Sequence, residues 1–299
     1  MGTREDAGRR SVPLPGNRTL VVRPATRADV PALEALYGEL DDEARYRRFF
    51  SMYRPNREFL ERMATAAERG GYELLAIVRD DRSGEERVIA EAGYTISRKG
   101  VAELAITVAE AWRGWVGAYL LDALVDAAAA RGVDNLRAEV LVANRPMLAL
   151  ARSRGYATVG HPDWTIVSLL IGTHGRTPTW PERDGPPRVL VEVPGGRWPA
   201  EQEARAAGLD VVVCPGPREY PARCPALDGE PCPLATHADA IVVVPPAGDS
   251  RWQALLESHA SLHAGVPVLV ERRPGPPTAV ALLQRIVRGR QVLPARADT

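Results

Sequence analysis

The stretch that decides the fold is Ala102-Glu103-Leu104-Ala105-Ile106-Thr107-Val108, followed by Trp112-Arg113-Gly114-Trp115-Val116-Gly117-Ala118 and an amphipathic segment. The first run has the composition of a strand. Residues 117–131 place leucine, valine and alanine on one stripe and stop at Gly132, which is typical of a helix. A small-residue turn between strand and helix offers free backbone N–H groups and a positive dipole end, which suit a diphosphate. Taken alone, Gly114 and Gly117 more often mark a plain helix entry.

The flanking segments extend this pattern in both directions. Towards the N-terminus, residues 19–23 read as a strand, and the helix capped by Asp29 is followed by helices over 41–50 and 56–69. Residues 73–79, 88–97 and 102–108 are β-rich and separated by turn clusters, which predicts an antiparallel meander. Beyond Gly132, the pattern predicts a strand over 136–142, a helix over 145–154, and a β pair over 156–159 and 164–170.

A change of pattern predicts two domains in this 299-residue chain. Residues 172–187 are dense in Gly, Pro, Thr and Arg and are predicted to be a linker. Past it, residues 189–193, 209–213, 240–244 and 268–270 are short aliphatic runs typical of buried parallel strands. We therefore expect a disordered lead-in over 1–17, a first domain over 18–171, a smaller parallel α/β domain of Rossmann or flavodoxin type over 188–292, and a tail over 293–299.

Composition excludes several classes of protein. Lys+Arg and Asp+Glu both number 38, which argues against nucleic-acid binding through a strongly basic surface. No apolar run approaches the roughly 20 residues that cross a bilayer, so no membrane association is expected. The N-terminal residues lack a signal peptide's apolar stretch, and three cysteines argue against a disulfide framework. These features predict a cytoplasmic protein; its oligomeric state is not predicted.

The element order over about residues 18–171 resembles the GNAT superfamily of N-acetyltransferases, which carry a Q/R-x-x-G-x-G/A turn. Arg113 and Ala118 fit the ends of that turn, and Asn144 fits the Asn that opens the later helix. The chain is most similar to the bacterial protein lysine acetyltransferases called Pat. Two runs carry that closer resemblance, Arg45-Tyr46-Arg47-Arg48-Phe49-Phe50 and Asn144-Arg145-Pro146-Met147. The resemblance implies a mixed, largely antiparallel sheet with flanking helices.

The resemblance also implies an acetyl-CoA site. The backbone of Ile106, Thr107 and Val108 would hold the pantetheine arm, and Asn144 would lie near the thioester. The turn that would hold the pyrophosphate comprises Arg113, Gly114, Val116, Gly117 and Ala118. Val116 stands where the family pattern has its central Gly, a residue that lets the backbone approach phosphate closely. This departure leaves a degenerate pyrophosphate turn as an alternative.

Glu103 is the candidate general base. Relatives with an Ala-Glu-aliphatic-Ala start to this strand use that Glu to take a proton from the incoming ammonium, usually through water. A carboxylate partly buried here would have a raised pKa. The alternative is an ordinary solvated strand residue. Counting back four residues from Gly155 gives Ala151 where many relatives have a Tyr that protonates the leaving thiolate, so that acid is absent.

The C-terminal region carries weaker signals. Cys214, Cys224, Cys232 and His237 have wide, irregular spacings without a C-x₂-C pair, so no metal site is predicted. Pro194-Gly195-Gly196 falls short of a dinucleotide-binding motif, which leaves a regulatory or interaction role.

Three functions follow from the whole sequence. The expected one is an acetyl-CoA-dependent N-acetyltransferase that acts on a protein lysine by direct transfer. The alternatives are an acetyltransferase of small amines and a degenerate acetyltransferase fold that serves as an interaction or sensor module.

Overall fold

The computed structural model describes residues 9–97, 101–160, 165–173, 178, 180, 185–217, 224–271, 280–281 and 283–284. The chain forms two compact units, Met1–Leu141 and Val142–Thr299. This division lies upstream of the predicted linker over 172–187, because the last two strands of the predicted first domain associate with the C-terminal strands.

The first unit is built on a mixed sheet in the order β1-β2-β3-β4-β5-β6. Its antiparallel strands are β1 (Arg10–Leu14), β2 (Arg18–Pro24), β3 (Tyr72–Asp80), β4 (Glu86–Ile96) and β5 (Ala102–Val108), and β6 (Asn135–Leu141) pairs with β5 in parallel. The predicted antiparallel meander is therefore confirmed.

Strand β1 corrects the expectation of a disordered lead-in over residues 1–17. Residues 10–14 pair antiparallel with β2, from Arg10 opposite Val22 to Leu14 opposite Arg18. The connection passes through Gly16 and Asn17, which both have positive φ, as tight turns between paired strands require. The strand is short and contains Pro13, a residue that disfavours strands, so the sequence pattern does not indicate it. Residues 1–8 lie outside the described residues.

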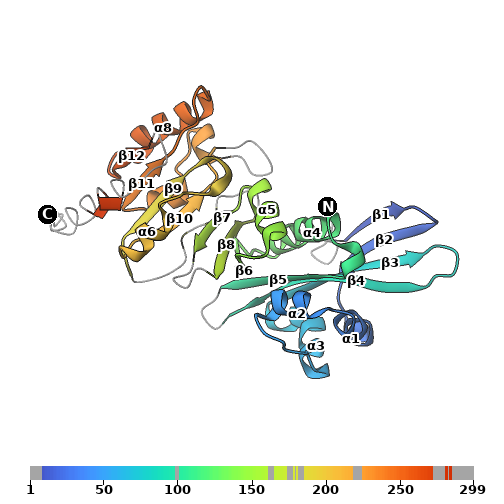
Figure 1. The fold of residues 1–299 in the computed structure, drawn as a ribbon. Helices are drawn as coiled ribbons and strands as arrows, with labels where there is room; N and C mark the ends of the chain where they lie inside the picture. The colour runs from blue at the N-terminus through green and yellow to red at the C-terminus, as the bar shows by residue number, and fades with distance from the viewer. Residues whose placement is uncertain are drawn as a thin grey trace. The chain divides into compact units, whose positions relative to one another are not determined.

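Helices cover both faces of this sheet (Figure 1). Helices α1 (Val30–Gly38), α2 (Asp42–Phe49) and α3 (Arg57–Ala64) lie on one face, and α4 (Trp115–Ala130) lies on the other. The side chains of Asp41 and Asn56 cap α2 and α3 by accepting hydrogen bonds from Ala44 N and Phe59 N. The predicted apolar stripe of α4 is buried, since Leu120, Leu121 and Leu124 are fully enclosed.

The second unit contains the strand order β8-β7-β10-β9-β11-β12. Strands β7 (Ala157–Gly160) and β8 (Ile166–Gly172) are antiparallel, and β9 (Arg188–Glu192), β10 (Asp210–Cys214), β11 (Ala240–Val243) and β12 (Val268–Val270) pair in parallel. The helices are α5 (Arg145–Ser153), α6 (Glu201–Ala206), α7 (Pro233–Thr236) and α8 (Ser250–Leu262). All four predicted C-terminal strands are present.

The parallel strands do not form a sheet of their own. Strand β10 pairs antiparallel with β7, with Val212 opposite Val159 and Val213 opposite Thr158. Ala157, Val159 and Leu170 share one apolar cluster with Leu190, Val212 and Trp252. The expectation of a separate parallel-sheet domain is therefore not confirmed, because hydrogen bonds and packing join strands from both sides of the predicted linker.

Candidate functional site

Strand β5 offers a length of backbone that can bind a ligand. Along one edge it pairs with β4 from Ala102 to Val108. Along the other edge it pairs with β6 only through Ala102 opposite Leu136 and Glu103 opposite Arg137. The backbone from Leu104 to Val108 therefore has a ladder on one side, which leaves its other edge to form hydrogen bonds with an extended ligand. The predicted pantetheine-binding residues Ile106, Thr107 and Val108 all lie on this segment.

The start of α4 suits an anion. No side chain caps this helix, and its first turn carries no acidic residue, so its initial N–H groups face no side-chain acceptor. Gly114 precedes the helix at φ +116°, a conformation that residues with a Cβ rarely adopt. Gly114 thus makes the sharp entry, and the helix presents the positive end of its dipole there.

Val116 does not obstruct this helix start. Its side chain is fully buried with the inward stripe of α4, whereas the neighbouring Trp115 is 46% exposed. A Cβ at Gly117 would make ordinary contact with Val108 at 3.5 Å, so that glycine is not required by space. Ala118 is half-buried. The residue with positive φ at this turn is Gly114.

Arg113 lies directly before Gly114 and is partly neutralised. Its guanidinium group is 3.6 Å from Asp41 and 3.9 Å from Glu110. The hydrogen bond from the Ala44 amide, with a smaller contribution from Arg113, lowers the pKa of Asp41. These long, half-exposed ion pairs are weak, so they leave Arg113 able to turn towards a phosphate.

Glu103 occupies the last position at which β5 and β6 pair. It faces Arg137 in the parallel register and Thr95 in the antiparallel one. Its side chain is exposed, so the partial burial that the sequence allowed does not occur. The carboxylate stands in solvent where the free edge of β5 begins, a position from which water can connect it to a bound amine.

Asn144 belongs to the second unit and has a structural role there. It is the N-cap of α5, and its side-chain oxygen accepts a hydrogen bond from Met147 N at 3.3 Å. Ala151, which stands where relatives have an acid, is fully buried. The predicted site residues are therefore divided between the two units, with all except Asn144 in the first.

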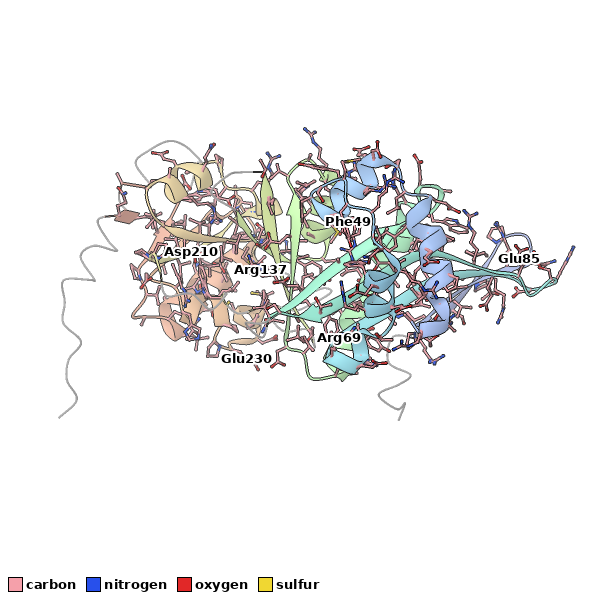
Figure 2. The ribbon with its side chains drawn as sticks, turned by 90° about the horizontal axis from the view of Figure 1, so that it is seen from below. Phe49, Arg69, Glu85, Arg137, Asp210 and Glu230 are labelled. Carbon is pink, nitrogen blue, oxygen red and sulfur yellow. The ribbon has the colours of Figure 1, made fainter. Side chains whose placement is uncertain are left out.

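A buried polar cluster behind β5 was missed by the sequence analysis. It consists of Tyr37, Arg48, Glu73, Glu91 and Thr107, between the sheet and helices α1 and α2; all are buried except Arg48, which is partly buried. The Tyr37 hydroxyl donates to Glu91 Oε1 at 2.7 Å, and Arg48 Nε lies 3.3 Å from the same oxygen. Arg48 Nε also donates to Thr107 Oγ1 at 3.1 Å. The cluster thus ties the end of α2, marked by Phe49 in Figure 2, to the candidate pantetheine strand.

The two carboxyl groups of this cluster, Glu73 and Glu91, share one environment, but their pKa values shift in opposite directions. Burial and the charge of Glu91 raise the pKa of Glu73 well above its usual range. Burial acts in the same direction on Glu91, but Arg48 and hydrogen bonds from Glu73, Thr107 and Tyr37 lower its pKa overall. A protonated Glu73 that donates to an ionised Glu91 accounts for both directions. A Cβ at Gly93 would lie 2.0 Å from Glu73 Oε2, so Gly93 provides the space for this carboxyl group.

The sequence did contain a signal for this cluster. Glu73 and Glu91 each lie within a buried apolar run of their strand, Tyr72–Val78 in β3 and Val88–Tyr94 in β4. A carboxylate in such a strand has to be enclosed, and an enclosed charge needs a partner.

The second unit shows no metal site in its described residues. Across the described chain, no group of three or more His, Cys, Asp or Glu side chains is placed to hold a metal ion. Cys232 is buried, and burial raises the pKa of its thiol. Its backbone N–H donates to His263 Nε2 at 3.3 Å. A further buried pair, missed in the sequence, joins Glu192 at the end of β9 to His259 Nε2 at 2.7 Å.

Comparison with known proteins finds similarity over part of the chain. Residues 33–156 match the model of the acetyltransferase (GNAT) family. Among solved structures, the GNAT domain of S. lividans PAT is 28% identical, with 55% of this chain and 97% of that chain covered and a TM-score of 0.48. The ribosomal-protein-alanine N-acetyltransferase of Brucella melitensis is 25% identical over 50% of this chain and 98% of its own, with a TM-score of 0.40.

A third similar structure is a GNAT superfamily phosphinothricin acetyltransferase from Sinorhizobium meliloti in complex with AcCoA. It is 22% identical over 54% of this chain and 93% of its own, with a TM-score of 0.42. Among the described helices of the present chain, none has the length and apolar character needed to cross a membrane.

Proposed function

We propose that this chain, whose residues 33–156 match the model of the acetyltransferase (GNAT) family, transfers an acetyl group from acetyl-CoA to a protein lysine. The observation that carries this proposal is the position of Glu103. It stands where the pairing of β5 with β6 ends and where the free backbone edge of β5 starts. A carboxylate is thereby placed at the inner end of a segment that can bind an extended acyl-bearing arm.

The residues present fit acetyl-CoA. The free edge of β5 from Leu104 to Val108 can pair with the amides of the pantetheine arm. The uncapped N-terminus of α4, behind Gly114, and the half-exposed Arg113 can hold the pyrophosphate. Acetyl-CoA supplies the activated acetyl group when bound.

Glu103 acts as the proton acceptor. An incoming lysine is an ammonium ion in solution, and its nitrogen has a lone pair for attack only after it loses a proton. An exposed carboxylate takes that proton through water. With Ala151 in place of the family's acid, protonation of the departing thiolate falls to water.

Exposed apolar side chains favour a protein acceptor over a small amine. Tyr46, Met52 and Tyr53 lie on α2 and the segment after it, and each is about half exposed, between 41% and 53%. Tyr53 packs edge-on against Phe49 and Phe59, which fixes its ring. Ordered, exposed aromatic residues are typical of protein-binding surfaces. This surface belongs to the same unit as Glu103.

The first test is Glu103→Gln, which removes the proton acceptor and keeps the shape. We expect acetyl transfer to a lysine peptide to fall by about 10²-fold at neutral pH, with acetyl-CoA affinity unchanged. Glu85→Gln is the matched control, since Glu85 is an exposed carboxylate at the far end of the β3–β4 hairpin (Figure 2). Unchanged rates and pH profile in Glu103→Gln would refute the assignment of the base.

A second measurement separates the alternatives. Calorimetric titration with acetyl-CoA is expected to show micromolar binding or tighter. No detectable heat at millimolar cofactor would instead favour a degenerate interaction module. Faster transfer to free small amines than to lysine peptides would contradict the protein acceptor and leave the transferase activity standing.

A further inference from the structure

A groove of about 850 Å³ lies within the second unit, in the size range of small-molecule sites. One wall is α5, and the other is the segment that runs from the carboxyl end of β9 into α6. Side chains of β7 and β8, Thr158 and Ile166 among them, line it between these walls.

The groove gathers positive charge. Arg145 and Arg152 stand two turns apart on the same face of α5, and Arg197 enters from the opposite wall. In the described part of the chain, none of these three guanidinium groups has a hydrogen-bond or ion-pair partner. The acidic residue on the lining, Glu201, is already paired with Arg205 at 2.9 Å. Three cations without a partner among the described residues, placed around one concave surface, create a positive potential that an anion would relieve.

The wall opposite α5 is held close to Arg152. The chain turns directly after β9 through Gly195 and Gly196, which both have positive φ. A Cβ at Gly196 would lie 3.8 Å from Arg152 Cγ, so the aliphatic stem of Arg152 packs near this backbone. The stem is thereby restrained, while its guanidinium group has no partner among the described residues. Carboxyl ends of parallel strands, such as that of β9, are the usual place for ligands in α/β sheets.

The lining chemistry defines the ligand class. Guanidinium groups match the oxygens of phosphate in a two-pronged geometry. Leu148, Ile166 and Trp198 supply apolar surface beside them, and Thr158 and Gln202 supply hydrogen-bonding groups. We propose that this groove binds a small organic phosphate of nucleotide size, distinct from the acetyl-CoA of the transferase site. The inference does not depend on the proposed function.

The test is calorimetric titration of the full chain with ADP while acetyl-CoA is saturating, so that phosphate sites of the transferase are already filled. ADP is expected to bind, and adenosine, which lacks the phosphates, is expected not to. The double variant Arg152→Gln/Arg197→Gln should weaken ADP binding by about tenfold or more. Arg251→Gln, which removes the same charge from an exposed position on α8, should leave it within about twofold.

Three results would overturn the proposal. The first is that millimolar ADP does not bind in the presence of acetyl-CoA, whether or not it binds in the absence of acetyl-CoA. The second is equal weakening in Arg251→Gln, which would show a general charge effect. The third is unchanged affinity in a double variant whose melting temperature matches that of the parent chain. Inorganic pyrophosphate, titrated in parallel, should show the same dependence on Arg152 and Arg197.

Discussion

At the scale of single residues, the chemistry-bearing positions differ in how well a sequence can identify them. Glu103 and Arg113 stand out because local motifs contain them. In the structure Glu103 lies where the free edge of β5 begins, and Arg113 lies directly before the uncapped start of α4. The Glu73–Glu91 pair belongs to no local motif. Its two members are 18 positions apart and meet only because β3 and β4 pair, which brings Glu73 opposite Gly93. Cross-strand register of this kind is decided by the assembled sheet.

The raised pKa of Glu73 predicts a pH-dependent stability. Because its pKa is raised in the folded chain, folding gains full stability from this group below its ordinary value of 4.5 and loses it as pH rises. Glu73→Gln keeps the shape and a donor to Glu91 but cannot ionise. Its free energy of unfolding, relative to the parent, should therefore increase as pH rises above 4.5. Urea titrations across this range measure it, with Glu85→Gln as a flat control. A difference that stays constant or declines would contradict a protonated Glu73.

Arg48 is expected to be indispensable for the same cluster. Burial opposes its charge, yet Tyr37, Glu91 and Glu73 raise its pKa, so the guanidinium group stays ionised beside Glu91. Arg48→Met would leave Glu91 enclosed without its cation, at a cost of about 3–5 kcal/mol in unfolding free energy. Adding Glu91→Gln removes the stranded charge and should restore part of that loss. A single variant within about 1 kcal/mol of the parent, or a double variant less stable than the single, would show that the pair is not coupled.

At the scale of elements, periodicity predicts most helices and strands, whereas conformation at their ends follows from packing. The apolar stripe of α4 is visible in the sequence and buried in the structure. The sequence does not show which residue of the turn has positive φ, because Gly114 and Gly117 are both candidates and Val116 lies between them. Packing decides the matter, since the helix buries Val116 and leaves Gly114 to make the entry.

The helix start yields a prediction about Val116. Although the family pattern has Gly at this point, Val116→Gly should not tighten acetyl-CoA binding, because the Val side chain faces the core. It should lower the unfolding free energy by about 2–3 kcal/mol, from lost burial and from glycine's poor helix propensity. Thermal unfolding and calorimetry measure the two effects, and Trp115→Ala, at the exposed neighbour, should cost less stability. Tighter binding in a stable Val116→Gly would mean that this side chain limits access to the helix start.

At the scale of the whole molecule, the boundary between domains is the feature that amino-acid composition predicts least well. Residues 172–187 have the Gly and Pro content of a linker. A prediction from this local composition takes no account of the strands on either side. Strand β7 precedes this stretch and β10 follows it, yet their backbones pair and their side chains share one cluster. Pairing between distant strands leaves no mark in composition, so the sequence predicts a boundary at a place that packing crosses.

This packing predicts how a truncated chain behaves. A fragment of residues 1–175 keeps β7 and β8 but loses β10 and the helices that cover Ala157, Val159 and Leu170. It would expose an unpaired strand edge beside an apolar face, a combination that promotes aggregation. We therefore expect this fragment to aggregate, as measured by size-exclusion chromatography, while the full chain does not. Its acetyl-CoA affinity, measured on soluble material, indicates whether the transferase site survives the cut.

A second fragment isolates the cause. Val159→Lys with Leu170→Glu places opposite charges on the face that the cut exposes, which should restore solubility if aggregation arises there. In the full chain the same two substitutions should destabilise, because both side chains are buried in the shared cluster. Solubility of the unmodified fragment, with acetyl-CoA affinity within about tenfold of the full chain, would instead support an independent first domain. If the two charges make the fragment more soluble but the full chain less stable, the cluster is part of one fold. A contact between two independently folded domains would not give these opposite responses.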